Sequence, residues 1–165
     1  MEAIKDIFVA GLRNAHAMET QAREMMERQS ERLTDYPDVH AKVRSHLVET
    51  QGQMKRLEEC LAKFDESTSS LKDTAQSFMG NMAAMAHATA DDEILKNTLA
   101  NNAFENFEIA AYKSLLAMCG PAGADNCKPA LEANLREEEA MAQWISANVG
   151  KVTEQYLQKQ MRSAA

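Results

Sequence analysis

Apolar residues recur at steps of three and four along four long segments of this chain, and in three of them a glutamate stands within the apolar stripe. This spacing is typical of a helix with one face against a core. The glutamates are Glu19, Glu105 and Glu138, each near the middle of its segment, where no helix terminus compensates its charge. An ionised carboxylate is costly to bury alone, so each must be paired, protonated or bound to a metal ion.

The composition favours an all-α chain. Its 165 residues include only 6 glycines and 3 prolines, and aromatic residues make up 5%. A chain of this length is most simply one domain, spanning residues 1–165. Helix-capping and helix-breaking residues predict five helices, at about 3–33, 37–64, 70–87, 92–119 and 129–158. Gly150 lies inside the last of these and is expected to weaken or bend it.

Helix length predicts the architecture. Four helices of roughly 25 to 30 residues would each span about 40 Å. The short segment 70–87 is then a crossover between two antiparallel hairpins, as in a four-helix bundle. The predicted core stripes are Phe8, Leu12, Ala15, Glu19, Ala22 and Met26; Val43, Leu47, Thr50, Met54, Leu57, Leu61 and Phe64; Leu95, Thr98, Asn102, Glu105, Ile109, Tyr112 and Leu116; and Leu131, Leu135, Glu138, Ala142, Ile145, Val149 and Val152.

Charge and hydropathy exclude several classes of function. The formal net charge of −7, with no basic stripe, argues against nucleic acid as a partner. We expect no membrane span and no signal peptide, and therefore a cytoplasmic protein. Cys60, Cys119 and Cys127 are expected to be reduced and partly buried, with a Cys119–Cys127 bridge as the alternative.

Side chains with oxygen and nitrogen ligands are expected at one level of the bundle. Glu19 lies about 16 residues before the first hairpin turn and Glu49 about 14 after it, and at 1.5 Å per residue these offsets agree to within roughly one turn. Glu108, on the edge of its stripe, and Glu138 lie about 15 residues either side of the second turn. Beside its apolar stripe, the second helix adds His46 and Glu49.

This ligand set suits iron or manganese, as in the di-metal carboxylate bundles. The usual pattern has a Glu from each of two helices and Glu-x-x-His from each of the other two. Here the second helix has His46-x-x-Glu49, the fourth has Glu105-x-x-Glu108, and the fifth has no histidine. A single glutamate on a helical stripe is more often snorkelling or salt-bridged, but agreement across four helices favours a metal site.

Neighbouring residues receive plainer interpretations. His16 is expected to be structural, and Tyr112 is either a packed core residue or a hydrogen-bond partner of a ligand carboxylate. Surface positions are predicted for Glu137, Glu139, His40 and His87, and gap-filling core positions for Met79, Met82 and Met85.

The chain resembles the YciE/YciF-type ferritin-like stress proteins in three segments taken together: HLVETQGQMKRLEE, FENFEIAAY and LREEEAMAQW. The motifs His-Leu-x-Glu-Thr-x-Gly-Gln and Glu-x-x-Glu-Ile-Ala-x-Tyr carry most of the specificity, and Glu19 stands at the place of the family's first-helix glutamate. The resemblance implies a ferritin-like four-helix bundle with a crossover, a homodimer, and a site for two iron or manganese ions. Matched position by position, it implies as metal ligands Glu19, Glu49, Glu105, Glu108, Glu138 and His46.

The chain departs from the family pattern around these ligands. Asn106 and Phe107 stand where the family has His-Tyr, and Ala142 replaces an acidic residue one turn after the fifth-helix glutamate. On the crossover segment, Met79 and Ala84 replace acidic residues. Because fewer polar groups surround the carboxylates, we expect weaker metal binding or a different ligand set than in relatives.

The leading hypothesis is a cytoplasmic stress-response protein that holds two metal ions and acts on iron with oxygen or peroxide, by ferroxidase-like or peroxide-reducing chemistry. The alternatives are a metal-free structural protein whose glutamates share protons, and a partner-binding dimer with a vestigial site. The sequence leaves open whether the protein turns over a substrate.

Overall fold

The computed structural model describes residues 2–64 and 92–164. The described elements are α1 (Glu2–Ser30), α2 (Pro37–Ala62), α4 (Glu93–Cys119), the short 3-10 helix η2 (Asp125–Cys127) and α5 (Lys128–Ser163). The predicted crossover helix at 70–87, with His87 and the methionine stripe, lies outside the described residues.

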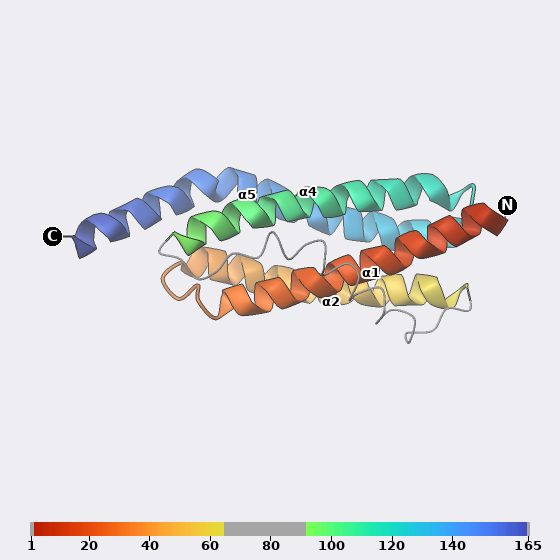
Figure 1. Ribbon diagram of the computed structural model, residues 1–165, viewed down its shortest axis with the longest axis horizontal. Helices are drawn as coiled ribbons and strands as arrows, with labels where there is room; N and C mark the ends of the chain where they lie inside the picture. Colours follow the sequence, from red (N-terminus) through yellow and green to blue (C-terminus); the bar gives the residue numbers. More distant parts are fainter. Residues whose placement is uncertain (1, 65–91, 165) are drawn as a thin grey trace.

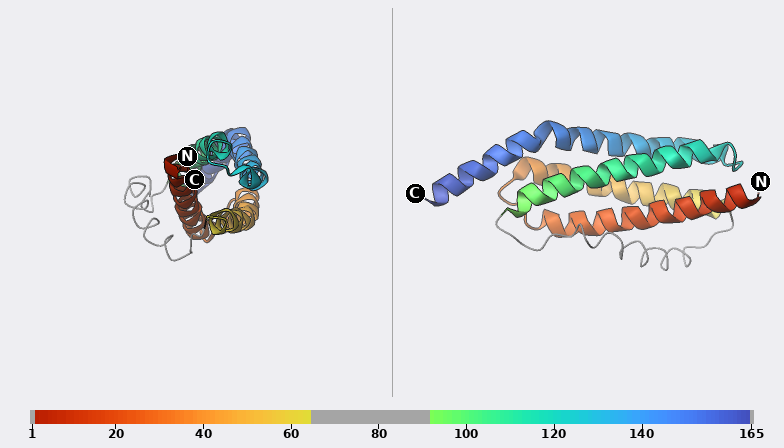
Figure 2. Two further views of the ribbon diagram at one scale, coloured as in Figure 1. Left: turned by 90° about the vertical axis from the view of Figure 1, so that its right-hand side faces the viewer. Right: turned by 45° about the horizontal axis from the view of Figure 1, so that its top comes forward.

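The four long helices form a bundle of two antiparallel hairpins, α1 with α2 and α4 with α5 (Figure 1). Viewed end-on, the helices occupy the corners of a square and enclose one interior (Figure 2). The predicted all-α four-helix bundle is therefore confirmed. None of the described helices combines the length and apolar character that a bilayer span requires.

The helix ends differ from the prediction at two places. α1 ends at Ser30, three residues early, where turn hydrogen bonds such as Arg32 N to Gln29 O take over. α5 continues through 36 residues to Ser163, past the predicted end at Gln158. The apolar stripe stops before that point, but the sequence contains no breaker there, and its Gln, Lys, Met and Arg residues favour helix. As a result α5 projects beyond the rest of the bundle (Figure 1).

The predicted core stripe of α1 is confirmed, with Phe8, Leu12, Ala15, Glu19, Ala22 and Met26 all buried. On α2 the predicted stripe is confirmed in part, with Val43, Thr50, Leu57 and Leu61 buried, whereas on α4 the predicted stripe is rotated away from the true core face. The buried faces are Val39, Val43, His46, Thr50, Gln53, Leu57 and Cys60 on α2, and Ile94, Asn101, Glu105, Glu108, Tyr112, Leu115 and Cys119 on α4. Leu47, Met54, Ile109 and Leu116 are only half-buried.

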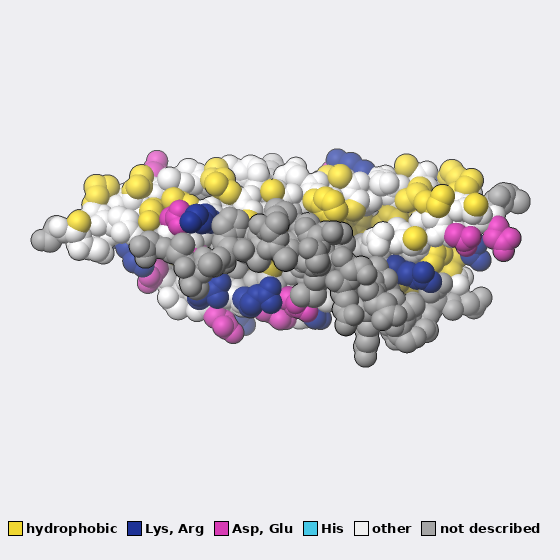
Figure 3. All heavy atoms as spheres, viewed as in Figure 1, with side chains coloured by type: hydrophobic (Ala, Val, Ile, Leu, Met, Phe, Trp, Pro, Cys, Tyr) yellow, Lys and Arg dark blue, Asp and Glu magenta, His cyan; other side chains and the backbone are white. Residues whose placement is uncertain are grey.

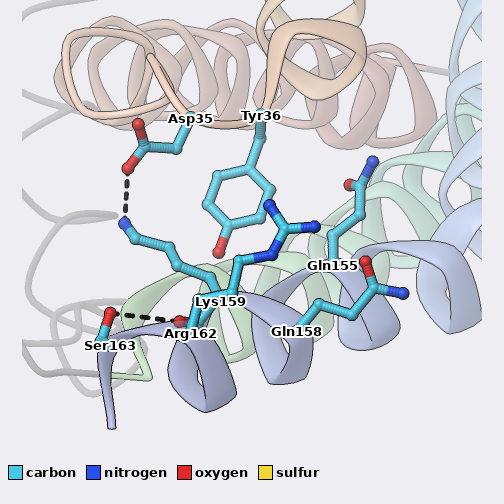
Figure 4. A pocket seen from close by; sticks show the side chains of 7 residues that line it. All are labelled: Asp35, Tyr36, Gln155, Gln158, Lys159, Arg162 and Ser163. Atoms are coloured by element: carbon cyan, nitrogen blue, oxygen red, sulfur yellow. Dashed lines mark hydrogen bonds and ion pairs between the residues drawn. The ribbon is translucent and has the colours of Figure 1, made fainter. Parts of the chain in front are cut away.

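Two connections fix the hairpins. Gly123 adopts a left-handed backbone conformation, φ 68°, between α4 and α5, a position that favours glycine. At the other end, Tyr36 is buried. Lys159 of α5 pairs with Asp35 in the loop before α2, and Lys151 of α5 pairs with Asp38 in the first turn of α2, each at 2.5 Å. Figure 4 shows the Lys159–Asp35 pair beside Tyr36.

All three cysteines are buried and free, so the predicted reduced thiols are confirmed and the Cys119–Cys127 bridge is not formed. Burial and contact with Cys127 raise the pKa of Cys60 to about 12. A thiol that stays protonated reacts slowly, so Cys60 acts as a packing residue.

The face drawn in Figure 3 carries basic and acidic side chains interspersed along the helices, with hydrophobic side chains between them. This face shows no continuous basic stripe, in agreement with the net charge of −7.

A reciprocal pair of amides sets the register of α1 against α4. Gln29 Nε2 donates to Asn101 Oδ1 at 3.1 Å, and Asn101 Nδ2 donates to Gln29 Oε1 at 2.8 Å. Both residues are buried, so neither amide can turn to water if its partner is lost.

We therefore expect Asn101→Ala to lower the free energy of unfolding by about 1–3 kcal/mol, because it leaves the Gln29 amide buried and unpaired. Urea denaturation measures the change. The double variant Gln29→Leu/Asn101→Leu should recover most of the loss, since it removes both polar groups. A single variant within about 0.3 kcal/mol of the wild type would contradict the assigned role.

Candidate metal centre

Five of the six predicted ligands lie inside the bundle. Glu19 comes from α1, His46 from α2, Glu105 and Glu108 from α4, and Glu138 from α5, and none is more than 4% exposed. We call these five residues the carboxylate cluster. Each helix position is explained by the spacing of the buried face, because steps of three and four keep side chains on one side of a helix.

His46 lies at the centre of the most compact part of the cluster. Its Nε2 is 3.3 Å from Glu105 Oε2 and 3.3 Å from Glu138 Oε2. Ligand atoms of these three residues all lie within 4.8 Å of one another, a separation that suits a single metal ion. One imidazole nitrogen faces two carboxylate oxygens, so either a proton or a metal ion must stand between them.

Glu49 lies outside the cluster, half-buried, where its Oε2 accepts a hydrogen bond of 2.7 Å from His46 Nδ1. The structure therefore does not bring Glu49 together with the other predicted ligands. A carboxylate on the outer nitrogen of a histidine fixes the tautomer and the ring orientation, and leaves the inner nitrogen for a ligand.

The carboxylate cluster contains unpartnered buried oxygens. Glu19 Oε2 and Glu108 Oε1 have no hydrogen-bond partner among the described residues, and Glu105 Oε2 and Glu138 Oε2 share a single neighbour, His46 Nε2, at 3.3 Å each. Thr50 Oγ1 and Gln53 Oε1, on the same face of α2, likewise have no hydrogen-bond partner among the described residues. Buried polar atoms are normally satisfied, so this concentration of lone pairs fits a cation-binding site.

Burial and mutual repulsion shift the acidity of the carboxylates. Burial, followed by the charge of Glu138, raises the pKa of Glu19 well above its ordinary value. Burial, followed by the charge of Glu19, does the same for Glu108. Burial raises the pKa of Glu105 to about 8, although His46 opposes the rise.

The imidazole responds in the opposite sense. Burial alone would lower the pKa of His46, but hydrogen bonds with Glu105, Glu138 and Glu49 raise it to about 12. Burial would raise the pKa of Glu138, yet its hydrogen bonds with His46 and Glu105 outweigh this and lower it. Without metal, the cluster is therefore held together by protons on His46 and on part of the carboxylates.

Polar residues outside the cluster orient its carboxylates. Gln53 Nε2 donates to Glu138 Oε1, and the Tyr112 hydroxyl donates to Glu19 Oε1 at 2.5 Å. Asn134 Nδ2 in turn donates to the Tyr112 oxygen at 2.8 Å. Tyr112 is thus both a packed core residue and the hydrogen-bond partner of a candidate ligand, which the sequence offered as alternatives.

The hydrogen-bonded chain continues to the surface. Arg56 Nε donates to Asn134 Oδ1, and Arg56 Nη2 pairs with Glu137 Oε2. Glu137 was predicted to be a solvated surface residue, which is wrong: its side chain is 28% exposed and paired across the helix interface with α2. No local sequence pattern indicates this pair, because Arg56 and Glu137 lie on different helices.

The remaining predictions are met more simply. His16 Nε2 lies 3.0 Å from Glu58 Oε1 and links α1 to α2, as expected of a structural histidine. Glu139 pairs with Lys113 on the surface, at 3.0 Å.

Sequence reasoning missed Asn134 and counted Thr50 only as a core residue. The signal for both was present, since Asn134 lies four residues before Glu138, and Thr50 four residues after His46.

A wide surface hollow of about 420 Å³ lies away from the cluster. It is formed by the loop before α2 and the projecting end of α5, around Tyr36 and Lys159 (Figure 4). None of the six predicted ligands lines it. Its open, polar character sets it apart from the buried carboxylates, and the cluster remains the better candidate for chemistry.

Comparison with known proteins assigns the chain to a family. Residues 3–158 match the model of a family described as a domain of unknown function, DUF892. The chain belongs to this family. Among solved structures, it is similar to a protein from Xanthomonas campestris pv. campestris, with 25% identity and a TM-score of 0.81 over 96% of this chain and 99% of that one.

Two further solved structures are similar to the chain. YcfI from Rhodopseudomonas palustris is 25% identical, with a TM-score of 0.66 over 87% of this chain and 92% of that one. The E. coli stress protein YciF is 20% identical, with a TM-score of 0.70 over 93% of this chain and 99% of that one, which shows a shared fold. The resemblance to the YciE/YciF-type family is thereby confirmed.

The shifted pKa values predict the pH dependence of the metal-free protein. Glu19, Glu105, Glu108 and His46 hold protons in the folded state that the unfolded chain has already released at the same pH. Stability therefore falls as pH rises from the unfolded carboxyl pKa towards the folded value of about 8 at Glu105. The lowered pKa values of Glu49 and Glu138 act in the other direction only below that window.

We expect chelator-treated protein to lose on the order of 3 kcal/mol of unfolding free energy between about pH 5 and about pH 8. Urea denaturation across this range measures the loss. Glu105→Gln should flatten the dependence because it removes one of the titrating groups. A metal-free protein whose stability is the same at both ends of the range would show that these carboxyls are already ionised.

Proposed function

We propose that this protein holds a di-metal carboxylate centre occupied by two iron or manganese ions. The observation that carries the proposal is the group of four buried carboxylates around His46: two of their oxygens have no partner among the described residues, and two more share one His46 nitrogen. The donor set of carboxylate oxygens and one imidazole is the one that iron and manganese prefer.

Charge balance supports two ions over one. Glu19, Glu105, Glu108 and Glu138, when ionised, contribute four negative charges to the interior of the bundle, where an uncompensated charge is unfavourable. Two divalent cations would neutralise all four and allow His46 to be neutral. A single ion would leave two carboxylates in need of protons.

Each residue has a defined part in this proposal. His46, Glu105 and Glu138 would hold one ion, and Glu19 and Glu108 would complete the ligand set. Glu49 keeps the proton of His46 on Nδ1, so Nε2 presents its lone pair inwards. Tyr112 and Gln53 hold the second oxygens of Glu19 and Glu138 and thereby orient both carboxylates. The metals would supply redox electrons and coordination positions for an oxidant.

By analogy with the neighbouring stress protein YciF, we place this activity in a stress response, with iron and oxygen or peroxide as reactants. Ferroxidase-like and peroxide-reducing reactions both fit a carboxylate-rich site from which the bundle excludes bulk water. A cytoplasmic location is part of the proposal, and the three free thiols support a reducing compartment.

A metal-free protein with a vestigial site is the second candidate, and one observation favours it. The protonated His46 pairs with both Glu105 and Glu138 at 3.3 Å, so part of the cluster can be neutralised without metal. In this case the unpartnered oxygens would be satisfied by shared protons and would serve only stability.

Metal analysis of protein purified without chelator, from cells supplied with iron and manganese, separates these functions. We expect about two ions per chain in the wild type, and at least a tenfold loss of affinity in Glu138→Gln. Glu139→Gln is the matched control. Glu139 is the next residue along α5, but its carboxylate is exposed and pairs with Lys113. Less than about 0.2 ion per wild-type chain, unchanged in Glu138→Gln, would exclude the di-metal centre.

We also propose that the protein is a homodimer. The projecting part of α5 exposes Leu157 and Met161, at 49% and 65%, one turn apart on the same face. A second copy could cover this pair, which the chain's own bundle leaves in solvent.

Light scattering tests this assembly. Leu157→Glu/Met161→Glu should convert the dimer to a monomer, while Val48→Glu, at a position 70% exposed on α2, should not. A dimer that survives the double substitution would place the interface elsewhere, and a monomeric wild type would refute the dimer itself.

A further inference from the structure

A small cavity lies between α2, α4 and α5, one helical turn from the carboxylate cluster. Its volume is about 20 Å³. Val43 lies three residues before His46, Asn101 four before Glu105, and Met141 three after Glu138. Because α5 runs antiparallel to α2 and α4, all three displacements point towards the same end of the bundle. The near edge of the cavity therefore lies about 5–6 Å from the cluster along the helix axes, and its far edge reaches Asn148 and Val152, ten and fourteen residues after Glu138.

The wall of the cavity is mainly apolar. Val39, Val43, Met141, Ile145 and Val152 line it and are all at least nine-tenths buried, and Trp144 lines it half-buried. A volume of this size is enough for about one small molecule. It excludes larger substrates unless the helices move.

The polar groups in the wall are already engaged. Asn101 is bonded to Gln29 through both ends of its amide. Thr98 Oγ1 donates to the Ile94 carbonyl at 2.7 Å, and Asn148 Nδ2 donates to the Trp144 carbonyl at 2.8 Å. A water or peroxide molecule would find few partners here and would lose hydrogen bonds on entry. An apolar diatomic molecule has no such bonds to lose.

We propose that this cavity binds dioxygen and holds it next to the carboxylate cluster. The inference rests on the proposed function, which it deepens by choosing dioxygen over peroxide as the oxidant. Val43 and Met141 stand between the cavity and the cluster, so their side chains control the approach of the gas. Dry cavities lined by apolar side chains also take up xenon. Xenon therefore provides a probe of the cavity that is independent of any metal.

The first experiment uses the full-length, metal-free protein under xenon, observed by methyl NMR. We expect saturable shifts at the methyl groups of Val43, Ile145 and Val152, and their loss in Val43→Ile, which fills the cavity. Val9→Ile is the matched control, a buried valine near the start of α1 outside the cavity. Should Val43→Ile fail to fold, Val152→Ile fills the same cavity from α5. Absence of saturable shifts in the wild type would overturn the proposal.

The second experiment measures dioxygen consumption by iron-loaded protein as a function of dioxygen concentration. We expect a several-fold rise in the KM for dioxygen in Val43→Ile with little change in metal content, and wild-type values in Val9→Ile. Equal KM values in both variants would overturn the assignment of dioxygen to the cavity while leaving the di-metal centre intact. A metal-loaded wild type that consumes no dioxygen, but reduces peroxide, would likewise overturn it. Failure to bind metal at all contradicts the proposed function instead, and the xenon result then decides by itself whether the cavity is a gas site.

Discussion

Four buried glutamates surround the His46 imidazole in the interior of the bundle, and the surrounding residues are arranged to offset the cost of burying these carboxylates. No interior of low polarity accepts four free carboxylates. Part of the cost is offset by the charge of His46 and by the hydrogen bonds that Gln53 and Tyr112 donate. The remaining unpartnered oxygens set the chemical demand that a pair of cations would meet.

The need to compensate these carboxylates explains why the core faces of α2 and α4 include polar residues at the level of the cluster. His46, Thr50 and Gln53 occupy successive turns of α2, while the leucine and methionine beside them lie half in solvent. A purely apolar stripe there would pack well but would leave the carboxylates of α4 and α5 without donors. Apolar residues such as Met18, Phe104 and Met141 are buried directly beside this polar part of the core.

The buried polar residues of α2 and α4 also limit how much of the structure could be predicted from the sequence. Helix number, hairpin turns and the stripe of α1 could be predicted, because turn residues and apolar spacing are local signals. Matching offsets about the two turns paired Glu108 with Glu138, which the structure brings together, and Glu19 with Glu49, which lies outside the cluster on the outer nitrogen of His46. The spacing of apolar residues misplaced part of the core face of α2 and most of that of α4. It puts Leu47 and Ile109 in the core, and it takes no account of a row of buried polar residues. Pairings between helices, such as Arg56 with Asn134 and Glu137, depend on tertiary packing and have no local signature.

The chain's one tryptophan lines the cavity beside the cluster. Its indole ring is half-buried, so its emission depends on what occupies that space and on how much water reaches it. No other tryptophan contributes background, which makes Trp144 a native fluorescent reporter, three residues from Met141 and six from Glu138 along α5. The state of the interior can thus be followed by light in the unmodified protein, in real time and at low concentration.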